Sequence, residues 1–582
     1  MPREQHSTIQ RQFFRFFQIL GSYRLLLFPA AILLLALFSS FPQPGHAQGQ
    51  AGYVISGLLN DPQGQPIAEA EVTAYIPSQE EPLAETTSQE DGTWALVLPG
   101  VPLNALQVTI QRPHFVSESF RLGPKELETL QQERVYRLGD LVLQRRVSAA
   151  FWIAGLIFLG VVLSIAFELF HSTTAALAGF SLLFLISYGL GAFNRDFFIF
   201  GFERGIEYIN WEVIFLVMGM MVIIAIIEGT GIFQWMAFQA YRLSRGNVAL
   251  LVVIMMGITA LASALLDNFT TMLLMTPISL QIGVALGINP LALIIPEVLA
   301  SNVGGISTLV GTPTNILIGA YAGIGFNDFL INQTLGVLAA LAAMAGFVLF
   351  YYRKELRKHG KGLSPRLYQR LEENASIENR SALWKSGLVF ALVLAGFVLG
   401  EQVHMVPAVP ALAGASLLLV WLKPDVHKMI TAVDWTTLVF FMALFVVVGA
   451  VQEVGLLSYV AAAMSRFIGD NLALGTFVVI FGVGTLSTAI ANIPLTASML
   501  PIIDFLSGSI PGASNHVLYY ALSMGAAMGG NGLLIGGEAN LVTAGITEQT
   551  EAPITFGEFL KVGLPVTYLT LFVGFLWLLV RF

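Results

Sequence analysis

Two polar segments interrupt long apolar runs, and their residues are of the types that bind ions inside membranes. The first, SNVGGISTLVGTPTN, covers residues 301–315, and the second, GGNGLLIGGEAN, covers residues 529–540. Backbone that leaves a helix at membrane depth is tolerated only where it lines a cavity or is buried in protein. Carbonyls before each break can hold Na+ or a proton-carrying water, and the amides that start the next helix can bind an anion. Glycine-mediated helix packing is the alternative interpretation.

Small residues and neutral oxygens dominate both segments. We expect Gly304 and Gly305 to adopt unusual dihedral angles and Pro313 to stop the helix. The candidate ion- and substrate-binding residues of the first segment are Asn302, Gly304, Gly305, Thr308, Gly311, Thr312, Thr314 and Asn315. Those of the second segment are Gly529, Gly530, Asn531, Gly532, Gly536, Glu538 and Asn540.

A third polar motif, LLDNFTTMLLMTP, carries an acid between two apolar runs. An acid at membrane depth is costly unless it has a partner or a function, so we expect a Na+ site near Asp267, Asn268 and Gly304. The alternative is a wet loop between two full crossings. Glu297 is a candidate proton or cation relay, although helix pairing through Ser or Thr explains it equally. Further candidates at this motif and its related segment ANIPLTASMLP are Thr270, Thr271, Asn492 and Thr496.

The composition is that of a polytopic membrane protein. The 582 residues are 55% hydrophobic and 11% charged, with a mean hydropathy of +0.73, whereas soluble proteins carry about 25% charged residues. Apolar runs of roughly 20 residues recur from about residue 149 onward. No basic stripe suggests nucleic acid as a partner, and we expect no cofactor. The absence of cysteine excludes disulfides, thiolate zinc sites and cysteine nucleophiles.

The N-terminal part has a different character. Residues 1–47 combine a basic start, a short apolar core and small residues, which predicts a signal peptide, with an N-terminal signal anchor as the alternative. Residues 48–145 alternate with period two between Asp-Pro and Asp-Gly turns, which predicts a small antiparallel, extracytoplasmic β-domain. Its segments ISGLLNDPQGQPIAEAEVTAY and SQEDGTWALVLP resemble the carboxypeptidase regulatory-like β-sandwich family. We expect His114 at its surface.

The rest of the chain repeats itself. Trp211 matches Trp435 and Asn268 matches Asn492 at one constant spacing, and Gly304 matches Gly529 one residue further. We therefore predict a transmembrane repeat 1 over 149–353 and a transmembrane repeat 2 over 385–582. The basic linker 354–384 belongs in the cytoplasm by the positive-inside rule. Counting crossings from outside gives the repeats opposite orientations, an architecture of secondary transporters with sites at the midplane. The last span of repeat 1 is predicted over 335–352.

Both glycine-rich segments carry a family resemblance. ASNVGGISTLVGTPTNILIGAYAGIGFNDFL and GGNGLLIGGEANLVTAGITE resemble the ion transporter superfamily, and most of all its citrate-transporter-like branch of arsenite pumps, NhaD-type Na+/H+ antiporters and the P protein. The resemblance covers about residues 150–582. It implies a polytopic α-helical fold of two inverted repeats, each with a re-entrant hairpin and a broken helix, and a homodimer. Where many members have Gly-Asp-Pro-Pro-Asn, this chain has Thr312 in place of the acid, which favours an anion or a neutral solute.

We therefore expect an ion-coupled secondary active transporter, or permease, in the plasma (inner) membrane, and not an enzyme. It would move a small inorganic or organic anion, driven by a Na+ or H+ gradient. Alternatives on the same scaffold are a Na+/H+ antiporter and an arsenite efflux permease. A membrane sensor whose β-domain binds a ligand is disfavoured because the cytoplasmic loop is too short for an output domain. Glu228, Glu453 and Asp504 are expected to cap helices or reach solvent at span ends.

Overall fold

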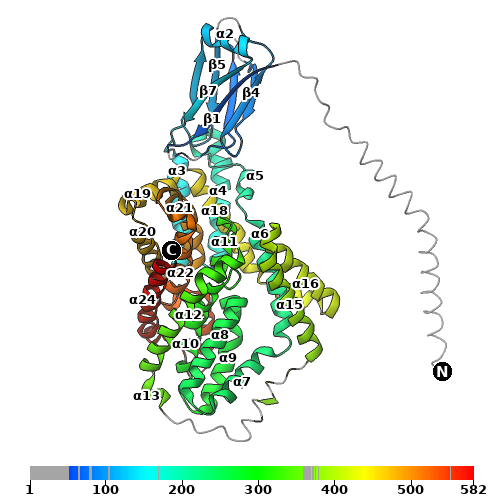
Figure 1. Cartoon of the computed structure of the whole chain (residues 1–582), viewed down its shortest axis with the longest axis vertical. Helices are drawn as coiled ribbons and strands as arrows, with labels where there is room; N and C mark the ends of the chain where they lie inside the picture. Colours follow the sequence, from blue (N-terminus) through cyan, green and yellow to red (C-terminus); the bar gives the residue numbers. More distant parts are fainter. Residues whose placement is uncertain are drawn as a thin grey trace, which may run out of the picture. The chain divides into compact units, whose positions relative to one another are not determined.

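The computed structural model describes residues 52–62, 64, 66–77, 81–102, 105–167, 169–357, 369, 372–373, 375, 377, 379–550 and 552–582 (Figure 1). The predicted signal sequence 1–47 and most of the predicted linker 354–384 lie outside these residues. The chain divides into two compact units, residues 1–144 and residues 145–582. Each unit is described by itself.

The first unit packs two β-sheets around one apolar core. One sheet has the strand order β4-β1-β7 and the other β3-β2-β5-β6. Alternate residues of β4, from Trp94 to Leu98, are buried, which is the period-two pattern of a strand with one solvated face. The strands are β1 Tyr53–Asn60, β2 Glu71–Tyr75, β3 Ala84–Thr87, β4 Thr93–Leu98, β5 Leu106–Gln111, β6 Glu118–Leu122 and β7 Val135–Val142.

This unit differs from the sequence-based prediction in three ways. Strand β7 pairs parallel to β1, whereas the other pairings are antiparallel. A helix, α2 (Pro124–Glu133), connects β6 of one sheet to β7 of the other. The prediction that His114 lies at the surface is wrong, because this residue is only 8% exposed. The segment that contains it folds back on the unit, where Val116 donates a backbone hydrogen bond to Gln144 at 2.8 Å.

The turn between β3 and β4 confirms the Asp-Gly signal in physical terms. Gly92 has a φ of +77°, and a Cβ there would lie 2.4 Å from the carbonyl oxygen of Leu59. Thr93 donates hydrogen bonds from its hydroxyl and its backbone N–H to Asp91, and these lower the pKa of that carboxyl. Their contribution to stability is therefore present at neutral pH and is lost as the pH falls through this lowered pKa.

The second unit is helical, and eight of its described helices are long and apolar enough to cross a membrane. Figure 1 shows α6, α15 and α16 together at one side of the unit and α20, α22 and α24 at the other, in agreement with the helix contacts. The helices before the linker are α3 Ala149–Ala166, α4 Ser172–Phe193, α5 Phe202–Glu207, α6 Trp211–Glu228, α7 Ile232–Ser244, α8 Val248–Leu265, α9 Asn268–Leu286, α10 Leu291–Gly304, α11 Pro313–Ala322, α12 Phe326–Tyr351 and α13 Arg353–Leu356. Those after it are α15 Arg380–Gly400, α16 Ala408–Leu422, α17 Val426–Thr431, α18 Trp435–Glu453, α19 Leu456–Ile468, α20 Leu472–Ser487, α21 Asn492–Ser509, α22 Val517–Gly529, α23 Glu538–Glu548 and α24 Phe556–Arg581.

The predicted duplication is present helix by helix, because α6 to α12 match α18 to α24 in order and type. The start of the first matched helix is capped by Asn210 in one half and by Asp434 in the other. Gly231 and Gly455, at the start of α7 and α19, have φ values of +79° and +84°. The packing is also repeated, since α8 lies against α10 as α20 lies against α22. The fold is therefore a polytopic helical membrane protein of two repeats with an added β-domain.

Short amphipathic helices account for most differences from the predicted spans. Helices α7 and α19 follow α6 and α18 and were not predicted, because their apolar residues occupy only one face. Helix α12 begins at Phe326, nine residues before the predicted span 335–352. Asp328 accepts the backbone N–H of Gly325 at 3.3 Å, so the helix starts in polar sequence that hydropathy alone excludes.

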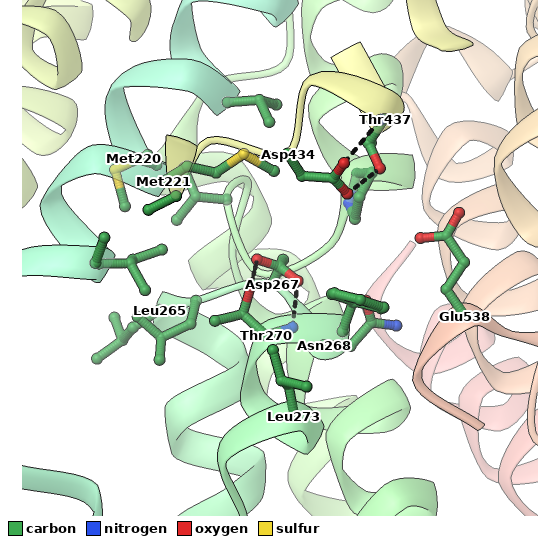
Figure 2. A pocket seen from close by; sticks show the side chains of 18 of the residues that line it. Met220, Met221, Leu265, Asp267, Asn268, Thr270, Leu273, Asp434, Thr437 and Glu538 are labelled. Carbon is green, nitrogen blue, oxygen red and sulfur yellow. Dashed lines mark hydrogen bonds between the residues drawn. The ribbon is translucent and has the colours of Figure 1, made fainter. Parts of the chain in front are cut away.

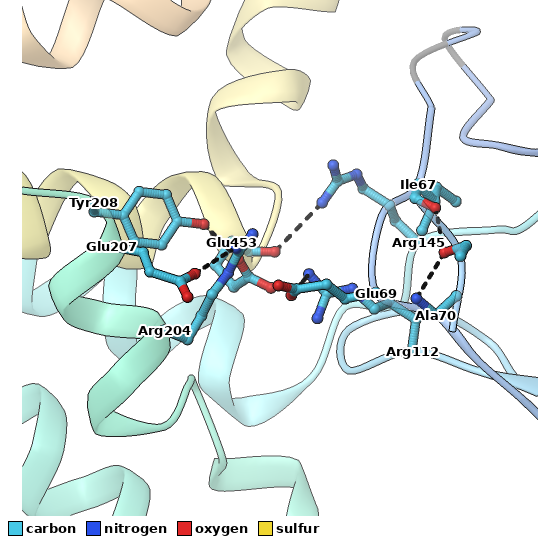
Figure 3. A network of polar contacts seen from close by, with 10 residues as sticks. Ile67, Glu69, Ala70, Arg112, Arg145, Arg204, Glu207, Tyr208 and Glu453 are labelled. Atoms are coloured by element: carbon cyan, nitrogen blue, oxygen red, sulfur yellow. Dashed lines mark hydrogen bonds and ion pairs between the residues drawn. The ribbon is translucent and has the colours of Figure 1, made fainter. Parts of the chain in front are cut away.

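A polar cluster fixes the C-terminal end of α18. Tyr208 donates a hydrogen bond to the carboxylate of Glu453, and Arg204 donates to the same oxygen at 3.3 Å (Figure 3). The Glu453 side chain is only 7% exposed. The prediction that Glu453 reaches solvent at a span end is therefore wrong, because neighbouring donors from outside α18 satisfy its charge.

Candidate functional site

Both predicted breaks exist. Helix α10 ends at Gly304 and runs through a short 3-10 turn, Gly305–Ser307, into extended backbone before Pro313 starts α11. In the second repeat α22 ends at Gly529, and α23 starts at Glu538. All residues from Leu291 to Thr312 are buried, which satisfies the condition for irregular backbone at membrane depth.

The glycines at the breaks act through close packing. The prediction of unusual dihedral angles is wrong for Gly304 and Gly305, whose φ values are −63° and −58°. A Cβ on Gly304 would lie 2.5 Å from the Cα and the carbonyl oxygen of Ala260, and one on Gly529 would lie 2.4 Å from the carbonyl oxygen of Gly484. These close contacts hold each broken helix against the first arm of its hairpin. Glycine packing and a broken helix therefore occur together.

Within each repeat, residues near the two ends of the break lie in close contact. A Cβ on Gly305 would meet the carbonyl oxygen of Gly311 at 2.5 Å, and one on Gly530 would meet that of Gly536 at 3.1 Å. Asn315 donates its amide to the carbonyls of Ile306 and Thr308, at 3.0 and 2.8 Å.

Asn540 makes similar bonds to the carbonyls of Gly530 and Leu533, at 2.7 and 3.1 Å. Each of the paired asparagines thus replaces backbone hydrogen bonds that are lost at its own break.

A buried asparagine joins the two breaks. Asn302 accepts a hydrogen bond from the side chain of Asn268 at 2.8 Å. It donates to the side-chain oxygens of Asn531 and Asn540, at 2.8 and 3.0 Å. Asn531 also donates to the carbonyl of Leu299 at 3.2 Å. The hairpin tip of repeat 1 and the broken helices of both repeats therefore meet at one amide side chain.

A cavity of about 160 Å³ lies beside this junction (Figure 2). Its walls come from α6, the tip between α8 and α9, the start of α11, the start of α18 and the start of α23. Four carboxylates line it: Asp267, Asp434, Glu538 and Glu228. No Lys, Arg or His is among its lining residues in the part of the chain that the structure describes. The cavity is therefore suited to a cation or a proton.

Two of these acids sit in the same local motif. Asp267 accepts the backbone N–H and the hydroxyl of Thr270, each at 2.7 Å. Asp434 accepts the backbone N–H of Thr437 at 3.1 Å and its hydroxyl at 2.6 Å. Each acid is thus the N-cap of a helix, and Figure 2 shows the two facing the cavity from opposite sides.

The fold itself does not require the cavity acids. Glu538 is the first residue of α23, at the position that Pro313 holds in α11, and no hydrogen bond to its carboxylate is present among the described residues. At the matching position of the other repeat, Asp267 is replaced by Ala491 and Asp434 by Asn210. Asp267, Asp434 and Glu538 therefore have no acidic counterpart at the matching positions of the other repeat. The described residues contain no group of three or more His, Cys, Asp or Glu side chains arranged to hold a metal ion.

The structure gathers most of the predicted site residues, but not all. The Thr312 and Thr314 hydroxyls bond each other at 2.9 Å, Thr271 donates to the Asp267 carbonyl at 2.8 Å, and Thr308 donates to the Ala264 carbonyl. Asn492 and Thr496, at the second hairpin, are buried away from the cavity, and the Thr496 hydroxyl has no partner among the described residues. Gly532 packs against Thr488.

Sequence reasoning missed two cavity residues, Asp434 and Thr437, and gave Glu228 only a capping role. Asp434 precedes α18 of repeat 2, at the position that Asn210 holds before α6 of repeat 1. The available signal was its Asp-x-x-Thr spacing, which is that of Asp267 and Thr270. Only the folded chain brings the start of α18 to the hairpin tip of the other repeat.

Comparisons with known proteins find a matching family model and relatives that are named transporters. The model of the citrate transporter family, CitMHS, matches residues 161–523. An uncharacterized transporter of Mycobacterium tuberculosis is 36% identical over 402 residues, which are 68% of this chain and 92% of that protein. An uncharacterized transporter of Synechocystis is 33% identical over 443 residues, 72% of this chain and 94% of its own length.

More distant similarities are found to an animal protein and to a protein of known structure. The P protein of Sus scrofa is 30% identical over 535 residues, 78% of this chain and 62% of that protein. The YdaH transporter of Alcanivorax borkumensis has a solved structure that is 15% identical, with a TM-score of 0.43, over 63% of this chain and 84% of that one. On the match of the family model and of the two uncharacterized transporters, this chain belongs to the citrate transporter family.

Proposed function

We propose that this chain is a secondary active transporter that couples the movement of a small anion to a Na+ or H+ gradient. The observation that carries the proposal is the meeting of two broken helices and a hairpin tip at Asn302, beside a cavity lined by carboxylates. Sites between inverted repeats, at the ends of half-helices, are where secondary transporters bind substrate and coupling ion. The cavity acids provide the cation side of this coupling.

The charge of the cavity limits how an anion can bind there. Asp267, Asp434 and Glu538 are close enough to repel one another, and an added anion would face the same repulsion. The start of α11 at Pro313 offers a partial positive charge, while the start of α23 is occupied by Glu538. The anion therefore enters together with a cation, or after protonation of the site. Citrate, after which the family is named, is the first anion to test, followed by sulfate and arsenite.

A variant that keeps the helix cap and removes the charge tests this proposal. Asp267→Asn can still accept the N–H of Thr270, so the start of α9 should hold. Asp267→Ala loses the cap as well and should be less stable by about 1 kcal/mol. We expect wild-type protein in liposomes to accumulate citrate, sulfate or arsenite under an imposed Na+ or H+ gradient, and Asp267→Asn to lose this accumulation while unfolding at the wild-type temperature.

The matched control is Asp425→Asn, because Asp425 caps the short helix α17 outside the cavity and accepts the backbone N–H of His427 at 3.0 Å. This variant should transport as the wild type does. Accumulation that does not depend on the imposed gradients, or that is unchanged in Asp267→Asn, would contradict the proposal that the cavity couples transport to an ion gradient.

Na+/H+ exchange is a second candidate function, favoured by the absence of basic residues from the cavity lining. It predicts that a pulse of Na+ dissipates a pH gradient in liposomes that contain no citrate, sulfate or arsenite. A pH-sensitive dye inside the liposomes measures this directly. Gradient dissipation without these anions supports exchange, whereas dissipation only in their presence supports cotransport. The homodimer and the plasma-membrane location implied by the resemblance stay predictions, and a mass measurement of the purified protein tests the first.

A further inference from the structure

A carboxyl group outside the cavity is completely buried in the membrane unit. Glu297 lies in the middle of α10, and its side chain is 0% exposed. The Ser279 hydroxyl of α9 is 2.8 Å from each of the two carboxyl oxygens. Thr259 of α8 faces the same carboxyl, and its hydroxyl has no partner with hydrogen-bond geometry among the described residues. The carboxyl therefore sits between both arms of the hairpin and the broken helix.

The geometry around Ser279 favours a protonated carboxyl. A hydroxyl group has one proton, so Ser279 can donate to only one oxygen of an ionised carboxylate. A protonated carboxyl can donate its own proton to Ser279 through one oxygen and accept the Ser279 proton at the other. Both 2.8 Å contacts are then hydrogen bonds. An ionised Glu297 would keep its buried charge with Ser279 as the only donor within hydrogen-bond geometry among the described residues, at a cost that is high inside a membrane.

No cation among the described residues compensates this carboxyl. The helices packed against α10 are α8, α9, α12, α22, α23 and α24. In the described part of the chain none of their charged groups forms an ion pair or a hydrogen bond with Glu297, and the groups that interact with it are Ser279 and Thr259. The charged groups of these helices are Asp267 at the start of α9, Asp328 of α12, Glu538 and Glu548 of α23, and Glu558, Lys561 and Arg581 of α24.

The second repeat shows that the fold does not need this polar group. At the matching positions Thr259, Ser279 and Glu297 become Val483, Ile503 and Leu522. These three side chains are 2%, 0% and 0% exposed, so they fill the same place as a buried apolar cluster. A buried polar group that can be replaced by well-packed apolar residues is weak evidence for a role in stability. Its presence in one repeat only points to a function.

We propose that Glu297 is the proton-carrying group of this transporter, which holds a proton while α8 and α9 pack against α10 and releases it when that contact opens to water. The proposal rests on the proposed ion-coupled transport and names H+ as a coupling ion. Asn302, the junction of the two breaks, lies five residues further along α10, or about 7.5 Å along the helix. Because Asp267 caps the same α9 that carries Ser279, one movement of the hairpin changes both the cavity and the environment of Glu297.

Infrared spectroscopy of the reconstituted full-length protein tests directly whether Glu297 is protonated, and it needs no substrate. The wild type at neutral pH should show the C=O stretch of a protonated carboxyl, shifted in D2O, and Glu297→Gln should lack this band. Ser279→Ala should shift the band, because one hydrogen bond to the carboxyl is removed. Glu548→Gln, which removes an exposed carboxylate at the end of α23, should leave the band unchanged. A full band in Glu297→Gln, or no band in the wild type, would overturn the proposal.

A transport measurement then separates this proposal from the proposed function. Glu297→Gln should lose pH-driven accumulation of citrate but keep the exchange of labelled for unlabelled citrate. Glu297→Leu, which copies Leu522, checks folding and should unfold at or above the wild-type temperature. If the wild type accumulates citrate and Glu297→Gln accumulates it equally under a pH gradient, Glu297 is not the proton carrier and the transporter assignment stands. If the wild type transports none of the tested ions, the proposed function fails. The infrared band still shows whether Glu297 carries a proton.

Discussion

At the scale of single residues, asparagine rather than charge holds the centre of this protein together. Asn302 uses both ends of its amide, accepting from Asn268 and donating to Asn531 and Asn540. Its side chain is only 3% exposed. A neutral amide can bridge two buried loops without the desolvation penalty of an ion pair, so the junction stays compact and its charges are confined to the cavity wall.

Replacing this junction residue should therefore affect stability and transport together. Asn302→Ala leaves buried amide groups of Asn268, Asn531 and Asn540 without their partner, at an expected cost of about 1–3 kcal/mol. Thermal unfolding of the purified protein measures the loss, and citrate uptake into liposomes should fall with it. The exposed amide Gln549 at the end of α23 provides the control, since Gln549→Ala should change neither property. An unchanged unfolding temperature in Asn302→Ala would contradict the junction role.

At the scale of the helices, each repeat contains a broken helix that packs against a helical hairpin. Gly304 packs on Ala260 of α8 as Gly529 packs on Gly484 of α20. Ser263 donates to the carbonyl of Ser301 at 2.8 Å, and Ser487 donates to that of Ala526 at 2.7 Å. The sequence pattern of small residues predicted the breaks. It left glycine-mediated packing as an alternative, and the structure shows that backbone contact with the hairpin, and not unusual dihedral angles, is the reason for these glycines.

A methyl group added at Gly304 should weaken the packing of the broken helix α10 against α8 of the hairpin. Gly304→Ala places a Cβ against backbone atoms of Ala260 that cannot move aside, so we expect a loss of about 1–3 kcal/mol. Gly257→Ala in the same α8 meets nothing within 4 Å and should be neutral or more stable by about 0.5–1 kcal/mol. Chemical or thermal unfolding of both variants tests the difference. Equal effects of the two substitutions would show that close packing at Gly304 is not the constraint.

At the scale of the whole membrane unit, duplication with inversion predicts opposite locations for matching residues. Arg242 of α7 and Arg466 of α19 occupy equivalent positions in the two repeats, and both are exposed. Counting crossings places the first on the cytoplasmic side and the second on the opposite side. Inverted repeats of this kind place their shared site between them and alternate its access by moving one part against the other.

Thiol labelling tests this inversion, because the natural chain has no cysteine. In intact cells a membrane-impermeant maleimide should label Arg466→Cys, and it should label Arg242→Cys only after the membrane is opened. The cysteine-free wild type is the background control. Labelling of both positions from one side would contradict the inverted arrangement and, with it, the site between the repeats.

The amino-acid sequence by itself determined the class, the duplication and the two breaks, because these follow from local properties: apolar length, repeated motifs, and glycine or proline where a helix should continue. It also identified Asp267, Asn302 and Asn540, which stand in such motifs. Only the tertiary structure decided which polar groups meet. Asp434 reaches the cavity from a helix far along the chain, and Asn302 joins Asn531 instead of a symmetry mate, since Ala527 holds its equivalent position. Local patterns fix where a chain can break, whereas pairing across repeats depends on how whole helices pack.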